Sequence, residues 1–256
     1  MNKLKNKTAF ISGASSGIGK ASAAAFASEG ANLILAARRI ERLKELENEL
    51  VNKYNIKVLS LQLDVRKLSE VKKAIASLKD DWRNIDILLN NAGLARGLSK
   101  IYEGDTDQWD EMIDTNIKGL LYVSRSIIPL MVERQRGHII NLGSLAGHES
   151  YPNGNVYCAT KYAVKGLSKG MRFDLYDKNI RVTSVDPGMV VTEFSEVRFS
   201  GDKAKADKVY EGIKPLSAED IADTILWCAT RPEHININEV LITPTAQASV
   251  SYVNRK

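Results

Sequence analysis

The chain has little of several features that would place it in a special class of protein. It holds only two cysteines, Cys158 and Cys228, in no metal-ligand spacing, so we expect free thiols, no metal site and a reducing compartment. No apolar run approaches the roughly 20 residues that cross a bilayer. The apolar stretch 9–11 behind the basic amino terminus is too short for the core of a signal peptide. We therefore expect a cytoplasmic protein without a membrane partner.

Runs of like charge, internal repeats and low-complexity tracts are also missing. The formal net charge of +5 is spread along the chain, which argues against nucleic acid as a partner and favours anionic small molecules. With 44% hydrophobic and 26% charged residues, the composition is that of a globular protein with a sizeable core.

Short apolar runs alternate with longer amphipathic stretches from one end of the chain to the other. Strands are predicted at 8–12, 32–37, 57–63, 85–89, 138–142, 180–185 and 239–242. Helices are predicted at 19–29, 40–54, 68–78, 108–133 and 157–177. Such alternation indicates an α/β fold, a doubly wound parallel sheet of Rossmann type, in one domain over 1–256. The polar segment 192–218 follows a strand end and is interpreted as a substrate loop or lid, or else as a solvated surface insertion.

A glycine-rich turn joins the first predicted strand to the first helix. Glycines let the backbone bend sharply and approach a pyrophosphate, and a helix N-terminus adds free N–H groups. The spacing is one residue longer than the common dinucleotide fingerprint, but the strand-to-helix context is right. The predicted cofactor-binding residues of this turn are Gly13, Ser15, Ser16, Gly17, Ile18 and Gly19.

The end of the second strand bears on which dinucleotide binds. An acidic residue there usually binds the ribose hydroxyls of NAD, whereas this chain has Arg38 and Arg39. A planar guanidinium suits a 2′-phosphate, so NADP is favoured over NAD, with Ser15 adding a hydroxyl. The alternative is that the two arginines merely begin a surface helix.

Small and polar residues follow the next two strands. Asp64 and Val65 end the third strand, where a short side chain can meet the adenine edge. The turn after the fourth strand, Asn90, Asn91, Ala92 and Gly93, leaves room for a cofactor while its amides tie neighbouring strands together.

Tyr157 and Lys161 place a phenol and an ammonium one helical turn apart, and Ser144 lies shortly before them. The pair alone is a weak signal. With the glycine turn it indicates a nicotinamide-dependent oxidoreductase, because a cation beside a phenol of pKa about 10 makes it a usable base.

The ordered set of motifs resembles the short-chain dehydrogenase/reductase family along nearly the whole chain. The resemblance implies that Tyr157 is the general acid/base, that Lys161 assists it and orients the nicotinamide ribose, and that Ser144 donates a hydrogen bond to the substrate oxygen. It also implies that Asn116 holds a relay water. The residues implied to fix the nicotinamide are Pro187, Gly188, Val190 and Thr192. A homotetramer with the helices 108–133 and 157–177 at one interface is implied as well.

Within that family, the segments 147–161, 192–199, 234–238 and 244–248 are similar to the NADP-dependent 3-hydroxy acid dehydrogenases. The implied reaction transfers a hydride between NADP and serine, L-allo-threonine or 3-hydroxypropionate-like acids, or the corresponding semialdehydes. The alternatives are a reductase of sulfoaldehydes, ketones or 3-oxoacyl thioesters, and a non-catalytic dinucleotide-binding regulator.

A small carboxylate substrate needs a cation or several donors, since a buried unpaired charge is costly. We expect Arg198, with Tyr151 and Asn153, to bind it; alternatively, Arg198 forms a subunit or lid salt bridge. Arg96 departs from the apolar residue typical of the family, and it would alter the preferred acid if it pointed into the cleft. His148 lies near Ser144, but as a loop histidine without a partner acid it is interpreted as a bystander or substrate contact.

Overall fold

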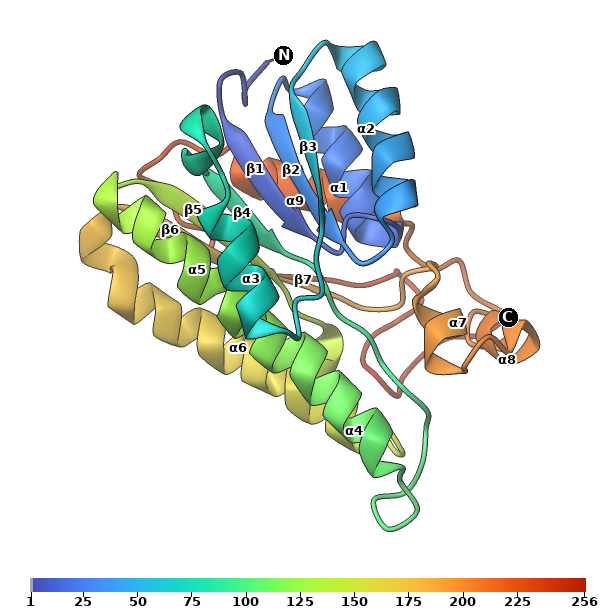
Figure 1. Cartoon of the computed structure of the whole chain (residues 1–256). Helices are drawn as coiled ribbons and strands as arrows, with labels where there is room; N and C mark the ends of the chain where they lie inside the picture. The colour runs from blue at the N-terminus through green and yellow to red at the C-terminus, as the bar shows by residue number, and fades with distance from the viewer. Residues whose placement is uncertain (1) are drawn as a thin grey trace.

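Seven parallel strands form one sheet in the computed structural model, which describes residues 2–256 (Figure 1). Their order across the sheet is β3-β2-β1-β4-β5-β6-β7, so the chain reverses direction across the sheet between β1 and β4. The strands are β1 Thr8–Ser12, β2 Asn32–Ala37, β3 Val58–Gln62, β4 Ile87–Asn90, β5 Gly137–Leu142, β6 Ile180–Pro187 and β7 Glu239–Ile242. The predicted doubly wound single-domain sheet is confirmed, with strand ends shifted by one or two residues; Met1 of the predicted domain lies outside the described residues.

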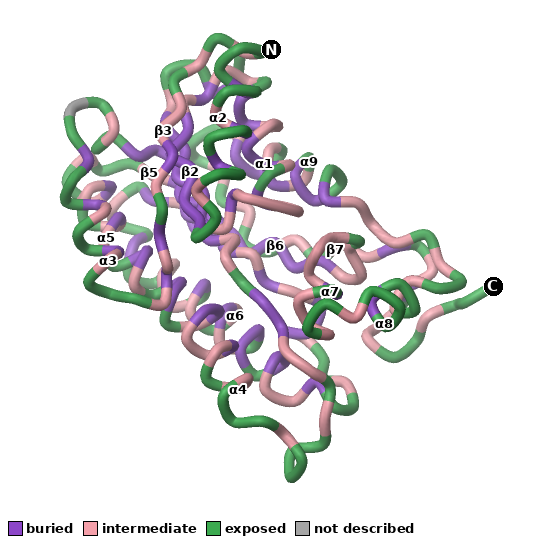
Figure 2. The backbone as a smooth tube through the Cα atoms, turned by 45° about the vertical axis from the view of Figure 1, so that its right-hand side comes forward, coloured by how far each residue is buried: buried purple, intermediate pink, exposed green. Residues whose placement is uncertain are grey.

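Helices cover both faces of the sheet, as Figure 1 shows. One hydrophobic cluster packs α1 Gly17–Ser28, α2 Ile40–Tyr54 and α9 Ala218–Ala229 against the sheet. A second packs α3 Leu68–Ala76 and α5 Leu120–Glu133 against the other face, where α6 Asn155–Leu175 also lies. Figure 2 shows that the buried residues concentrate in the strands and on the inner sides of these helices. In the described part of the chain, no helix is long and apolar enough to cross a membrane.

The predicted helix 108–133 is interrupted in the structure. It begins earlier, as α4 Thr106–Ile113, passes through a π-helical segment at Asp114–Gly119 and continues as α5. Widened turns of this kind often occur at functional sites, and this one contains Asn116. The sequence pattern did not predict this π-helical segment, because the spacing of apolar residues hardly changes when one residue is inserted in a helical turn. It also gave no boundaries for α9, although Cys228 lies in that helix.

The predicted lid segment 192–218 contains two short helices, α7 Phe194–Arg198 and α8 Lys203–Lys208. It leaves the sheet after β6 and returns to it through α9, so it projects beyond the carboxyl ends of the strands (Figure 1). Ligands bind at this edge in open α/β sheets.

Candidate functional site

Two adjoining cavities lie along the carboxyl edge of the sheet. The first, of about 280 Å³, is lined by the glycine turn, Arg38, Arg39, Asp64 and Val65, and we call it the dinucleotide groove. The second, of about 250 Å³, contains Ser144, Tyr157 and Lys161, and we call it the substrate cavity. Asn91, Gly93, Leu142, Thr192 and Phe194 line both, so the two spaces are continuous.

The floor of the dinucleotide groove is made of two turns that bond to each other. The Ser12 hydroxyl accepts hydrogen bonds from the backbone N–H groups of Asn91 and Ala92, both at 3.1 Å. The Asn91 amide donates in turn to the carbonyls of Ser12 and Gly13. A Cβ on Gly19 would lie 2.3 Å from the Gly13 carbonyl oxygen, so this close approach requires glycine. The two turns therefore fix each other's backbone at the carboxyl edge of the sheet.

Arg39 is bonded on both sides of the groove. Its guanidinium donates to the hydroxyls of Ser15 at 3.3 Å and Ser16 at 2.8 Å, and it pairs with Glu193 at 2.9 Å. Burial raises the pKa of Glu193, but the bonds from Arg39 and Arg42 outweigh it and bring the pKa below its usual value. Arg38 also lines the groove. Cations and hydroxyls thus gather where a 2′-phosphate was predicted.

Two predicted cofactor residues have partners that sequence alone did not indicate. Asp64 lines the groove but pairs with Arg66 at 2.6 Å, a hydrogen bond that lowers the pKa of the carboxyl group. Asn90 is buried inside the sheet, where its side-chain nitrogen donates to Ser124 and Asn141, both at 2.9 Å. Asn90 does not line either cavity and instead ties β4 to its neighbours, as predicted for the amides of this turn.

Tyr157 and Lys161 lie on the first turns of α6 and are nearly buried, 9% and 6% exposed. Burial raises the pKa of Tyr157, while the positive charge of Arg198 and hydrogen bonding with the Ser144 hydroxyl act in the opposite direction. Burial lowers the pKa of Lys161 to about 8, and Asp186 partly offsets this. The Lys161 ammonium donates to the Leu142 carbonyl at 2.9 Å and lies 5.9 Å from the centre of the Tyr157 ring.

Asn116 is buried behind this cluster. Its side chain accepts from the Leu94 N–H and donates to the Leu94 carbonyl and to Thr160, at 2.8–3.0 Å. A Cβ added to Gly93 would lie 3.3 Å from Oδ1 of Asn116 and 3.8 Å from Nζ of Lys161. The two side chains therefore border the same small space, although Asn116 does not itself line the cavity.

Arg198, at the end of α7, lies over the aromatic rings of the substrate cavity. Its guanidinium carbon is 4.9 Å from the centre of the Tyr157 ring and 5.2 Å from that of Phe194, and Nη2 donates to the Tyr151 hydroxyl at 2.8 Å. Within the described part of the chain, its Nε is buried without a hydrogen-bond partner. Asn153 is not brought into this group: it is exposed on a turn with φ of 65° and does not line the cavity.

Arg96 does not line the substrate cavity. It pairs with Glu111 of α4 at 2.6 Å and donates to the Val197 carbonyl at 2.7 Å, while the next N–H, that of Gly97, donates to the Arg198 carbonyl. Arg96 therefore holds the last turn of α7 in place rather than selecting the substrate directly.

His148 has the acidic partner that the sequence did not reveal, so that part of its interpretation was wrong. Its Nε2 lies 2.7 Å from the buried Asp186 carboxylate, and its Nδ1 lies 2.8 Å from the Lys165 amine, with Glu239 nearby. Asp186 follows in sequence by 38 positions, which explains why local inspection missed it. His148 does not line the substrate cavity.

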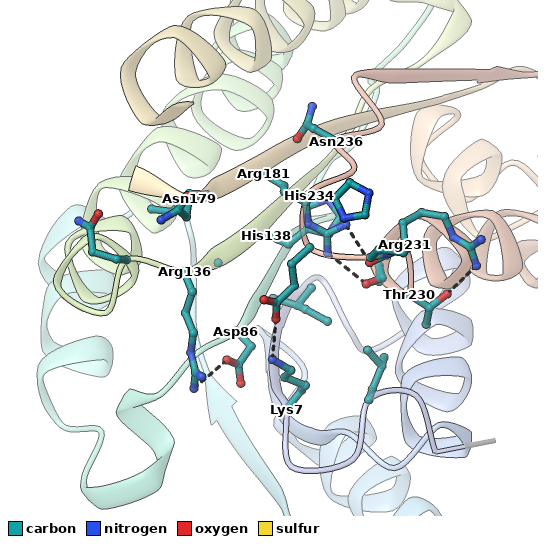
Figure 3. A pocket seen from close by; sticks show the side chains of 18 of the residues that line it. Lys7, Asp86, Arg136, His138, Asn179, Arg181, Thr230, Arg231, His234 and Asn236 are labelled. Atoms are coloured by element: carbon teal, nitrogen blue, oxygen red, sulfur yellow. Dashed lines mark hydrogen bonds and ion pairs between the residues drawn. The ribbon is translucent and has the colours of Figure 1, made fainter. Parts of the chain in front are cut away.

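A larger cavity, of about 790 Å³, lies at the opposite, amino-terminal end of the strands (Figure 3). Many cations line it, and several of them already have partners. Arg181 donates to four backbone carbonyls, Lys7 pairs with Glu233, and Arg136 pairs with Asp86. The contacts of Arg181 and Lys7 fasten the loop after α9 to the sheet and give this end a structural role.

Sequence reasoning missed several residues of the substrate cavity. These are Met189, Phe194, Tyr210 and Gln247, together with others on the lid and the tail. Phe194 packs edge-on against the Tyr157 ring, with centroids 5.6 Å apart, and Tyr210 donates to the Val190 carbonyl. Their signal was available, since aromatic residues stand out in a segment that is otherwise polar.

A doubly wound sheet with a glycine turn at its switch point and a buried Tyr–Lys pair beside the same groove defines a class, the Rossmann-type oxidoreductases. The model of the short chain dehydrogenase family matches residues 7–203. The chain is 45% identical to the NADP-dependent 3-hydroxy acid dehydrogenase of Schizosaccharomyces pombe, over 100% of this chain and 99% of that protein. This chain belongs to the short-chain dehydrogenase family.

Two further proteins resemble this chain over nearly its whole length. The serine 3-dehydrogenase of Rhizobium radiobacter is 43% identical over 96% of both chains. The closed form of a serine dehydrogenase complexed with NADP⁺ superposes with a TM-score of 0.91 at 43% identity, covering 97% of this chain and 100% of that one.

Proposed function

We propose that this protein transfers a hydride between NADP and small 3-hydroxy acids, with serine as a representative substrate. The observation that carries the proposal is the placement of Arg198, which has an unused, buried N–H and lies over the ring of the predicted base, Tyr157. The names of the relatives support the same substrate class and cofactor.

The dinucleotide groove has the donors that NADP requires. Arg39, held by Ser15 and Ser16, and the neighbouring Arg38 would bind the 2′-phosphate, and the first N–H groups of α1 would bind the pyrophosphate. Thr192, Pro187, Gly188 and Val190 line the substrate cavity and would hold the nicotinamide end. When bound, NADP⁺ supplies the acceptor for the hydride.

Tyr157 takes the proton of the substrate hydroxyl in this mechanism. As a phenolate it is stabilised by two cations, Lys161 and Arg198, and it is itself nearly buried. Ser144 donates a hydrogen bond to the substrate oxygen, where charge changes during the reaction. Lys161 returns the proton toward solvent through the space that it shares with Asn116 near Gly93.

Arg198 fixes the other end of the substrate. A 3-hydroxy acid has one carbon between the carboxylate and the carbon that bears the hydroxyl. A carboxylate bound by Arg198 and Tyr151 therefore leaves the hydroxyl within reach of Tyr157, since both aromatic rings lie within 6 Å of the guanidinium. A bidentate or charge-assisted bond of this kind is among the strong hydrogen bonds of proteins.

Replacing Arg198 with Met tests this function. We expect kcat/KM for serine to fall about 30- to 1,000-fold, because a substrate carboxylate would lose its charge-assisted partner. For a neutral alcohol of similar size kcat/KM falls much less, because only the effect of Arg198 on Tyr157 is lost. Steady-state reduction of NADP⁺ with both substrates measures the difference. An equal loss on both substrates would assign Arg198 to lid structure instead.

We also infer a cytoplasmic homotetramer. Large apolar side chains stay exposed on α5 and α6, including Leu121, Tyr162 and Phe173, and both cysteines are free thiols, as suits a reducing compartment. Light scattering should give about four times the chain mass of 28.3 kDa. A monomeric mass at micromolar concentration would contradict the assembly.

A further inference from the structure

Two arginines on one side of the dinucleotide groove share a carboxylate from the lid on the other side. Arg39 and Arg42 stand at the start of α2, and Glu193 stands in the lid just before α7. The Arg39–Glu193 distance is 2.9 Å and the Arg42–Glu193 distance is 2.6 Å, each to a different carboxylate oxygen. The lid is therefore tied to the rim of the groove by two ion pairs.

The two arginines are not equivalent. Arg39 lines the groove and donates to Ser15 and Ser16, so its guanidinium would bind a 2′-phosphate. Arg42 does not line the groove, and in the part of the chain that the structure describes its side chain has one polar partner, Glu193. When a phosphate engages Arg39, the pair between Arg42 and Glu193 remains.

We propose that Glu193 and Arg42 form a clasp that closes the lid over the bound dinucleotide and slows its dissociation. The inference rests on the proposed function for the identity of the bound molecule. Glu193 and Arg42 are positioning residues, since they act on the lid and touch no reacting atom. Because the clasp does not depend on the 2′-phosphate, it retains NADPH and NADH alike.

The competing possibility is repulsion. The Glu193 carboxylate lies close to the predicted phosphate site, and like charges there would weaken binding of NADP alone. Loss of the Glu193 charge should speed the dissociation of NADPH if the clasp holds and slow it if repulsion dominates. Dissociation of NADH should become faster in the first case and stay unchanged in the second, so one variant separates the two.

The Glu193→Gln variant keeps the size of the side chain and removes its charge. We expect NADPH and NADH to dissociate from it about three- to tenfold faster than from the wild type, a modest change because both ion pairs are about half exposed. Stopped-flow displacement, followed by the nicotinamide fluorescence, measures both rates. Added salt should speed release from the wild type more than from the variant.

The matched control is Glu196→Gln, which removes the same charge from an exposed position on α7. It should leave both rates unchanged. For NADPH, whose 2′-phosphate engages Arg39, Arg42→Met should reproduce the effect of Glu193→Gln, and the double variant should release NADPH no faster than either single variant, because both changes then break the same contact.

Slower release of NADPH from Glu193→Gln with unchanged release of NADH would overturn the clasp in favour of repulsion. Unchanged rates for both cofactors would overturn it as well. Failure of the wild-type protein to bind NADPH at all would instead contradict the proposed function, so the two failures are distinguishable.

Discussion

Tyr157→Phe will lower kcat by about 10²- to 10⁴-fold, the range that a positioned general acid/base contributes. The substitution removes one oxygen and keeps the ring, which packs against Phe194 with centroids 5.6 Å apart. Binding of NADPH should therefore be retained. Turnover of serine with NADP⁺ and fluorescence titration of NADPH give the two quantities.

Tyr162→Phe provides the control for that result. It deletes a phenol hydroxyl from the same helix, at a position that is 44% exposed and whose hydroxyl donates to the His148 carbonyl. We expect it to keep wild-type turnover. A Tyr157→Phe enzyme that turned over at the wild-type rate would remove Tyr157 from the reaction, whatever the control showed.

Lys161→Met should inactivate the protein and also make the dinucleotide-free form more stable. Burial lowers the pKa of Lys161 from 10.5 to about 8, so at pH 7 the folded state carries a charge that costs about 3 kcal/mol. Methionine removes this cost but leaves the Leu142 carbonyl without its donor, which costs about 1 kcal/mol. The net gain in the free energy of unfolding at pH 7 is about 2 kcal/mol, measurable by urea denaturation.

The pH dependence identifies the origin of that gain. Between about pH 8 and pH 10.5 the folded wild-type protein loses the Lys161 proton while the unfolded chain keeps it, so wild-type stability rises with pH. The difference between the wild type and Lys161→Met must shrink over that window. Lys169→Met, an exposed change on the same helix, should show no gain at either pH. A difference that stayed constant with pH would point to repacking rather than to charge.

The sheet was predictable because its signal is local. Each residue of β1 is buried, as is each residue of β4, and each strand contains a run of three apolar residues, 9–11 and 87–89. The glycine turn and the Tyr157–Lys161 pair were predictable for a related reason. Each requires particular residue types within a few positions of one another, and the close contact of Gly19 with the Gly13 carbonyl tolerates no side chain.

The sequence did not predict side-chain hydrogen bonds and ion pairs between residues that are far apart in the chain. Arg96 was expected to matter only if it entered the cleft, but its partners, Glu111 and the Val197 carbonyl, lie 15 and 101 positions away. The pairing of His148 with Asp186 is equally remote. Asn153 was grouped with Arg198 by proximity to Tyr151, yet its left-handed backbone turns it outward. Sequence spacing carries no information on which of several charged residues will meet.

The floor of the groove and the walls of the substrate cavity come from different parts of the chain. The interlocked turns around Ser12 and Asn91 belong to the first half, whereas Tyr151, Phe194 and Arg198 belong to the second. Asn91 and Phe194 line both cavities, but no hydrogen bond joins the two sets in the described part of the chain, so the energetic effects of substitutions in them should be largely additive. Substitutions can then change coenzyme preference and substrate range independently. Glu193 is an exception, because it belongs to the second half of the chain but pairs with Arg39 and Arg42 of the first.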